Sequence, residues 1–400
     1  MGERIMDGFP SREEALEDFY AAWQTSRSTE FVTLDDAVGR YTSTSTVSKI
    51  ALPVFRSSTC DGIAVRSSEF IDGLPDTSSW RVGVDYVRAD TGDDFDDAFD
   101  AVIMIEKAAI QADGSVILDD DVTVSAGTNV NTCGATIKKG DPLLEAGVRI
   151  RPTDLAVFAM GGHSMVEVWR RPKVAFVPTG SELVSAGTQP LRGQNVDANS
   201  LMVKHMLLEM GAEPVVFPLV RDDEERLRQA IETALAAADI IVINAGTAVG
   251  QEDINARLIQ ERGSIVHHYI AAVPGRPMMM AVIDGKPVIN LPGPILAAYY
   301  GADWCLRAVV AHWYGVTASR HPVVQAYFEN DFKSIPKFAN LGRLNVSLDE
   351  KGAYVATPLD FRKGQLAQAM ASNAQRISPI GETFIAAGDS ILVELLRDTI

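Results

Sequence analysis

The chain lacks any long hydrophobic run: nowhere in its 400 residues do about 18 uncharged apolar residues follow one another, so no membrane span is predicted. Its first residues, MGERIMDGFPSREEALEDF, lack the basic and then apolar pattern of a secretory signal. Basic residues are also scarce, because 36 Lys and Arg stand against 53 Asp and Glu, for a formal charge of −17. Nucleic acids and anionic membranes bind through Lys and Arg clusters, so we expect neither as a partner. A local site can still bind a small anion.

Cysteine is rare as well. The three residues, Cys60, Cys133 and Cys305, are far apart and odd in number. They therefore argue against a disulfide framework or a thiolate zinc site and predict a cytoplasmic protein. We interpret Cys60 as a small packing residue. With 46% hydrophobic and 22% charged residues, the composition is that of a globular protein of two to four compact units.

The most regular pattern runs from about 172 to 315. Strand-length apolar runs (KVAFV, EPVVFPLV, DIIVINAG) alternate with helix-length amphipathic runs (NSLMVKHMLLEMG, DDEERLRQAIETALAAA, NARLIQERG). A strand at SIVHHYIAAV, a hairpin at MMMAVIDGKPVINL and a long helix from Ile295 to about Tyr314 follow. We expect the Asp222-Asp223 pair to cap the helix after it. This alternation predicts a doubly wound α/β domain, with a parallel sheet covered by helices on both faces.

The rest of the chain has other patterns. Residues 11–40 look helical (EEALEDFYAAW, LDDAVGR), and 45–170 hold short β-rich runs such as AVIMIE and SVILDD. The acid-rich stretch 85–121 is typical of a solvated face. Residues 323–400 read as short strands with Gly turns, which predicts a small β barrel or sandwich.

Four Gly-containing loops fall where strands of the sheet are predicted to end, which is where α/β sheets bind ligands. Glycine lets backbone N–H groups approach a ligand closely. Pro294 stands where a helix should begin, so the Gly293 loop can present N–H groups to an anion. An anion or cofactor site is therefore predicted, although turns of this kind are also common. The loops are Pro178–Glu182, Asn244–Asp253, Pro274–Pro277 and Leu291–Pro294.

The order of the motifs resembles one family over some 380 residues, the MoeA/gephyrin E-domain family of molybdopterin molybdenumtransferases. The motifs are EEAL, LDDAVGR, PVFRSSTCDGIAV (53–65), Thr91-Gly92, DAVIMIE, PTGSEL, Asp197-Ala198-Asn199, NAGTAVGQED, PGRP and LPGP. QLAQAMASNAQRISP and IAAGDSILVELL resemble the family's last domain.

The resemblance implies four domains and a homodimer with its site between subunits. It places an α/β molybdopterin-binding domain at 1–26 and 172–325 and an elongated connector at 27–50 and 140–171. It also places an inserted β-rich domain at 51–139 and a C-terminal β barrel at 326–400.

The resemblance further implies a reaction: molybdate (or tungstate) is inserted into adenylylated molybdopterin, and AMP is released with the help of Mg²⁺. Three acids match the family's motifs: Asp61, Glu182 and Asp253. The resemblance implies that they are catalytic residues and metal ligands. The implied substrate-binding residues are Thr91, Thr179, Gly180, Ser181, Asn199, Gly246, Thr247, Gly250, Pro274, Gly275, Arg276, Pro292 and Gly293. Each acid also has a plain structural interpretation. Asp61 could be a turn acid before Gly62, Glu182 a first-turn helix acid, and Asp253 a helix cap.

The chain departs from the family's pattern at several site motifs. Ala245 stands where relatives have Gly, Val273 and Arg276 where they have Lys, and Asn131 where they have Arg. Two other functions therefore stay open. One is a non-catalytic or re-purposed paralogue that binds a pterin or an oxyanion, or scaffolds other cofactor proteins. The other is an unrelated α/β nucleotide-binding enzyme, although the chain has neither a GKS/GKT phosphate loop nor a G-x-G-x-x-G after a strand.

Overall fold

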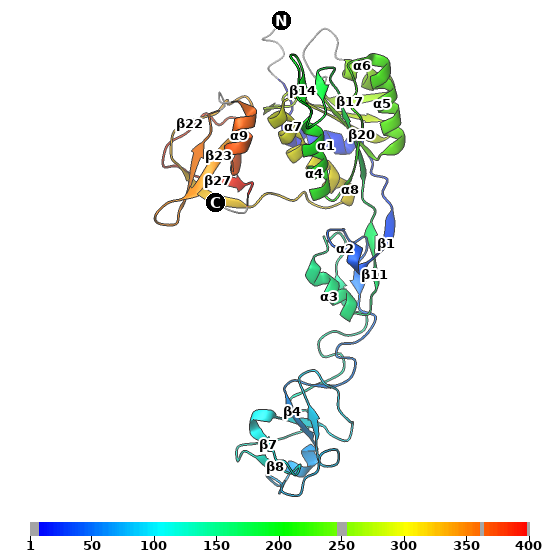
Figure 1. Cartoon of the computed structure of the whole chain (residues 1–400), viewed down its shortest axis with the longest axis vertical. Coiled ribbons are helices and arrows are strands. Elements are labelled where there is room, and N and C mark those ends of the chain that lie inside the picture. The colour runs from blue at the N-terminus through cyan, green and yellow to red at the C-terminus, as the bar shows by residue number, and fades with distance from the viewer. Residues whose placement is uncertain (1–7, 246–253, 361–363, 398–400) are drawn as a thin grey trace. The chain divides into compact units, whose positions relative to one another are not determined.

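The computed structural model describes residues 8–245, 254–360 and 364–397 (Figure 1). The chain forms two compact units, one from Met1–Ser28 with Arg170–Ile400 and the other from Thr29–Trp169. No helix within the described ranges has the length and apolar character needed to cross a membrane.

The larger unit contains a six-stranded sheet in the order β15-β12-β16-β20-β19-β17. Four of these strands are parallel: β15 (Glu213–Val216), β12 (Lys173–Pro178), β16 (Ile240–Asn244) and β20 (Lys286–Leu291). The other two, β19 (Met279–Ile283) and β17 (Gly263–His267), are joined to the sheet by antiparallel pairing. The hairpin predicted at MMMAVIDGKPVINL is thus formed by β19 and β20, and it makes this edge of the sheet antiparallel. Asp284 and Gly285 both have a positive φ and make the two-residue turn that reverses the chain between β19 and β20.

Helices cover both faces of this sheet, as predicted. On one face, α5 (Glu224–Ala237) and α6 (Ile254–Arg262) pack Leu227, Ile231 and Ile259 onto Ile241 and Ile243. The Asp223 side chain caps α5 by accepting from the Arg226 N–H. The other helices of this domain are α1 (Arg12–Ala22), α4 (Asn199–Glu209), α7 (Ile295–Gly301) and α8 (Arg307–Tyr314).

The predicted long helix after residue 295 is present, but its middle differs from an α-helix. Between α7 and α8, Ala302–Leu306 (η3) form a π-helical turn, an irregularity that is often found at functional sites. The strand predicted over 264–273 is also interrupted. It ends at His267, and β18 (Ala272–Val273) pairs instead with β23 of the C-terminal barrel.

The C-terminal region is a closed five-stranded barrel, β23-β24-β21-β27-β25 and back to β23, which confirms the predicted barrel. Its strands are β21 (Val323–Phe328), β23 (Ala339–Leu348), β24 (Tyr354–Pro358), β25 (Ala374–Ser378) and β27 (Ser390–Leu395). Inward residues such as Ala326, Phe328, Val346 and Ala356 form its core. An antiparallel pair of short strands, β22 (Phe332–Lys333) and β26 (Phe384–Ile385), and helix α9 (Gln365–Ala371) complete it.

The smaller unit has two hydrophobic centres. One lies around β1 (Thr29–Thr33), its antiparallel partner β11 (Met165–Trp169), α2 (Leu34–Ala37), α3 (Pro152–Met160) and the pair β2 (Thr46–Val47) and β10 (Pro142–Leu144). The other lies around β4 (Gly62–Val65), β5 (Val87–Ala89) and β6 (Ala101–Met104). Short pairs flank it: β3 (Ser57–Ser58) with β9 (Val130–Asn131), and β7 (Ala108–Ile110) with β8 (Val116–Leu118). Cys60 packs at the edge of this second core, and burial raises the pKa of its thiol.

Two elements of this unit differ from the prediction. The sequence predicts a helical stretch over 11–40, but residues 29–33 form β1, because TEFVT is rich in β-branched and aromatic residues that suit a strand. In the stretch expected to be β-rich, α3 is a helix that begins at Pro152, with Asp154 accepting a hydrogen bond from the Arg151 N–H. The four-domain boundaries are finer than the two units and stay a prediction.

Candidate functional site

Three of the predicted loops meet in a pocket of about 420 Å³ at the carboxyl ends of β12, β16 and β20. Glu182 enters this pocket from the β12 loop, Asn199 from the start of α4, and Gly293 from the β20 loop. Asp197 lines it too, from the segment after β14 (Asn195–Val196), which pairs with β13 (Leu183–Val184). Three residues from separate predicted motifs are thus brought together here, as the position of ligand sites in α/β sheets leads one to expect.

A chain of amide hydrogen bonds holds the pocket's floor. The Asn199 Nδ2 donates to the Asn244 Oδ1 at 3.0 Å and to the Gly293 carbonyl at 2.7 Å. The Asn244 Nδ2 in turn donates to the Pro292 carbonyl at 2.9 Å. Both asparagines are buried. Pro292 itself is buried and does not line the pocket, so its part is to anchor the Gly293 turn.

The residues of the loop after β12 differ in burial and in hydrogen-bond partners. Thr179 is buried, and its hydroxyl donates to the Asn244 carbonyl at 2.9 Å. Gly180 has a φ of +147°, and a Cβ there would lie 2.8 Å from the Glu182 Oε2, so only glycine lets that carboxylate fold back over the turn. Ser181 is exposed and exchanges two bonds with Asp222, at 2.9 and 3.0 Å. Asp222 therefore anchors this loop, and Asp223 alone caps α5.

The Pro274–Pro277 loop lies at the same edge of the sheet, since it leads into the antiparallel strand β19, whose Met279 pairs with Asn290 near the end of β20. Pro274, Gly275 and Arg276 are nevertheless not among the residues that line the 420 Å³ pocket. The Arg276 guanidinium lies 5.7 Å from the centre of the Phe338 ring.

One backbone N–H group beside the Gly293 loop, where free donors are predicted, already has a hydrogen-bond partner. The Leu296 N–H, in the first turn of α7, donates to the Gln365 Oε1 at 2.9 Å. That amide is not available to an anion while this bond is made. Gly246, Thr247, Gly250 and Asp253, which the sequence also assigns to the site, lie outside the described residues.

Asp61 and Thr91 lie together in the smaller unit. The Thr91 N–H and hydroxyl both donate to the Asp61 Oδ1, at 2.7 and 2.8 Å. These bonds hold the pKa of Asp61 below its usual value, so the exposed carboxylate is ionised at neutral pH. Glycine is required at position 62, directly after Asp61, because a Cβ there would lie 1.9 Å from the Ile103 carbonyl of the neighbouring strand β6. The bonds suit a turn acid and a ligand-binding acid equally well.

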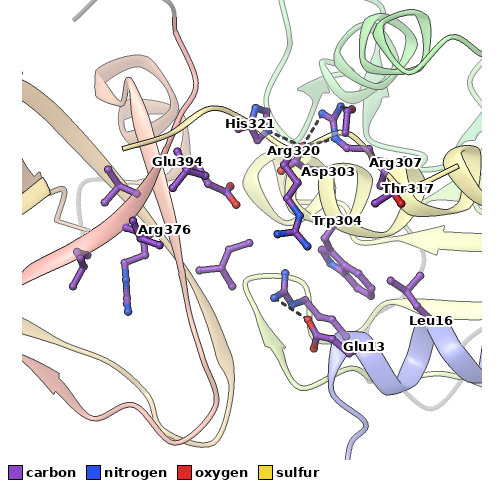
Figure 2. Close-up of a pocket in the computed structure, with 18 residues that line it drawn as sticks. Glu13, Leu16, Asp303, Trp304, Arg307, Thr317, Arg320, His321, Arg376 and Glu394 are labelled. Carbon is purple, nitrogen blue, oxygen red and sulfur yellow. Dashed lines mark hydrogen bonds and ion pairs between the residues drawn. The ribbon is translucent and has the colours of Figure 1, made fainter. Parts of the chain in front are cut away.

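Sequence reasoning places Asn244 in a predicted loop and Asp197 in a family motif but assigns neither residue to the site, and both line the pocket. A usable signal existed for Asn244, because a polar residue ends an otherwise apolar buried strand, IIVIN. It also missed a second, larger pocket of about 750 Å³ between the α/β domain and the barrel (Figure 2). There, Asp303, His321 and Glu394 have ligand-type atoms within 4.8 Å of one another.

The fold thus defines a multi-domain protein in which a doubly wound α/β domain, with a pocket at one edge of its sheet, is joined to a β barrel and to a separate β-rich unit. Two family models match the chain: the MoeA N-terminal region over residues 10–162 and a probable molybdopterin-binding domain over 175–312. The chain belongs to the MoeA family of molybdenum cofactor biosynthesis.

Relatives of similar length support this assignment. The Haemophilus influenzae molybdopterin molybdenumtransferase is 27% identical over 84% of this chain and 81% of its own length. The one from Bacillus subtilis is 26% identical over 94% of this chain and 92% of its own. A molybdopterin biosynthesis MoeA protein of Pyrococcus horikoshii has a structure that matches with a TM-score of 0.81 and 25% identity, covering 98% of this chain and all of that one.

Proposed function

We propose that this chain is a molybdopterin molybdenumtransferase, which inserts molybdate (or tungstate) into adenylylated molybdopterin and releases AMP. The observation that carries this is the pocket at the strand ends, where Glu182, Asn199 and Gly293 come together from three separate motifs. Its volume of about 420 Å³ and its mixed lining of acidic, amide and apolar residues suit a ligand with a polar ring and phosphates. Full-length similarity to relatives that bear this name supports the same activity.

Mg²⁺ is part of this proposal, and the residues fit it. Magnesium is commonly held by one or two carboxylates together with substrate phosphates and water. Glu182 and Asp197 supply two carboxylates in the pocket, and Asp61 is kept ionised by Thr91. The only group of three metal-ligating residues within the described ranges lies elsewhere, at Asp303. Magnesium binding at this pocket should therefore depend on substrate oxygens. When bound, the ion would neutralise phosphate charge.

The chain's own groups have separate parts in this scheme. Asp61, Glu182 and Asp253 would hold the cation, and Thr91 would fix Asp61. Arg276 and the amides of the glycine loops would hold the oxyanion. We further propose a cytoplasmic homodimer with its site between subunits, which can contact other proteins of cofactor biosynthesis.

The test uses the full chain with adenylylated molybdopterin, molybdate and Mg²⁺, and measures AMP release. We expect turnover that Glu182→Ala abolishes, whereas Glu225→Ala, an exposed acid on α5, keeps it. A wild-type protein that binds the nucleotide but releases no AMP with molybdate or tungstate would overturn the catalytic proposal. The chain would then be a pterin or oxyanion carrier, with binding that survives Glu182→Ala and weakens in Arg276→Ala.

A further inference from the structure

Asn244, the last residue of β16, contacts three of the segments that build the 420 Å³ pocket at the strand ends: the β12 loop, the start of α4 and the β20 loop. Its Nδ2 donates to the carbonyls of Pro292, at 2.9 Å, and Leu291, at 3.4 Å. Its Oδ1 accepts from Asn199, and its main-chain carbonyl accepts from both the N–H and the hydroxyl of Thr179. Only 2% of the residue is exposed, so these partners replace water.

An amide is well suited to these contacts. A primary amide offers two donors and an acceptor in one plane, and Asn244 uses all three. A carboxylate would set oxygens against two carbonyls, and a hydroxyl has only one donor. Because a buried polar group without a partner is costly, any replacement should force the loops to move.

The contacts also fix the distance between two walls of the pocket. The Asn199 Nδ2 bridges the Asn244 Oδ1 and the Gly293 carbonyl, so the start of α4 and the Gly293 turn are tied through one amide. Beside it, the Ala245 N–H donates to the Leu291 carbonyl at 2.9 Å. A Cβ on Gly293 would lie 3.4 Å from the Ala245 Cβ, which shows how closely the two loops approach.

We propose that Asn244 is a positioning residue for substrate: it sets the spacing between the Gly293 turn, Asn199 and the β12 loop that carries Glu182. It acts through these groups and need not touch the reacting atoms. This inference rests on the proposed function for the identity of the ligand, but the geometry alone assigns Asn244 its place. Loss of the Asn244 amide should therefore weaken substrate binding more than it lowers the rate at which the bound substrate reacts.

The experiment compares the wild-type protein with Asn244→Asp and the milder Asn244→Ser. A matched control is Asn373→Asp, since Asn373 exchanges two 2.7 Å bonds with Val346 in the barrel, outside the pocket. Binding of adenylylated molybdopterin is measured by calorimetry, and AMP release gives KM and kcat. Thermal melting reports stability.

We expect the nucleotide Kd and KM to rise at least tenfold in both Asn244 variants, with kcat changed less than KM. Asn373→Asp should lower the melting temperature without changing Kd. If Asn244→Ser melts like Asn373→Asp and keeps the wild-type Kd and KM, Asn244 is merely structural and the inference is wrong.

The two proposals fail separately. Nucleotide binding that is weakened by the Asn244 variants, in a wild-type protein without turnover, would overturn the transferase but support the positioning role. If the wild-type protein turns over and the Asn244 variants bind nucleotide as tightly as it does, the transferase is supported and the positioning role is overturned. A wild-type protein that binds no nucleotide would overturn both.

Discussion

Removing the charge of Asp303 should loosen the attachment of the C-terminal barrel to the α/β domain. Asp303, in the π-helical turn, is 7% exposed and accepts from Arg307 at 2.8 and 3.2 Å and from His321 at 3.0 Å, all at Oδ1. Its Oδ2 accepts from Gln375 of β25, whose amide also donates to Glu394 of β27. One carboxylate therefore joins a helix of the α/β domain, the segment between α8 and β21, and the barrel.

The size of the effect follows from burial. Breaking a buried ion pair by removing one partner costs about 3–5 kcal/mol, because the other charge stays buried and uncompensated. In Asp303→Asn this charge is Arg307, whose side chain is 16% exposed. The remaining amide oxygen can still accept one bond, so we expect the lower end, a loss of about 3 kcal/mol.

The pH dependence has a definite sign. Burial opposes ionisation of Asp303, but the hydrogen bonds and charges of His321 and Arg307 outweigh it and hold its pKa below 3.8. The hydrogen bond to Asp303 raises the pKa of His321 above 6.5, despite burial and Arg307. Stability from the imidazolium is present below pH 6.5 and is lost as pH rises through the raised pKa. Stability from the carboxylate is present above pH 3.8 and is lost as pH falls through the lowered pKa. The cluster should be most stabilising between about pH 4 and 6.5. The other charged residues of the pocket are Arg12, Glu13, Arg320, Arg376 and Glu394, and the charge of Glu394 also raises the pKa of His321.

The loss of stability is measured by urea unfolding followed by the fluorescence of the five tryptophans, two of which, Trp304 and Trp313, lie in η3 and α8. Proteolysis of the segment 315–322 is a second measurement. Glu232→Gln is the control, because its pair with Arg262 is about half exposed and should contribute less than about 1 kcal/mol. The reasoning is refuted if Asp303→Asn unfolds within about 1 kcal/mol of the wild-type protein. It is refuted equally if the wild-type midpoint stays constant from pH 5 to 8.

Three further predictions concern the pocket at the strand ends. Ala245 has a φ of +79°, so Ala245→Gly should remove about 1–2 kcal/mol of left-handed strain and, after the entropic cost of glycine, stabilise the protein by about 0.5–1 kcal/mol in a urea titration. Gly180→Ala should displace the Glu182 carboxylate, since a Cβ at position 180 would lie 2.8 Å from it. We expect kcat/KM for AMP release to fall at least tenfold. Unchanged kinetics would show that Glu182 need not fold over this turn. Because the chain carries −17 and its substrates are anions, nucleotide binding measured by calorimetry should weaken with EDTA and change with ionic strength, and binding indifferent to both would contradict the proposed cation.

Patterns that depend on near neighbours in the sequence were sufficient to predict much of this protein's fold. The alternation of apolar strands and amphipathic helices predicts the α/β domain because burial on a sheet face or a helix stripe repeats at a fixed period. The Gly-turn strands after residue 323 predict the barrel for the same reason. The motif order indicated the family, and three of its loops indeed line one pocket: those of Glu182, Asn199 and Gly293.

Tertiary structure alone decided the rest, because contacts between distant residues leave no period in the sequence. Only the packed sheet places Asn244 against Asn199 and Pro292, 45 and 48 positions away. Only the folded loops direct Ser181 to Asp222 and leave Arg276 beside Phe338. The sequence by itself determined most elements of the α/β domain and the barrel, and it predicted the edge of the sheet at which a pocket forms. The partners of each polar group were decided by the fold, because a buried amide or carboxylate must find its hydrogen bonds wherever packing brings them.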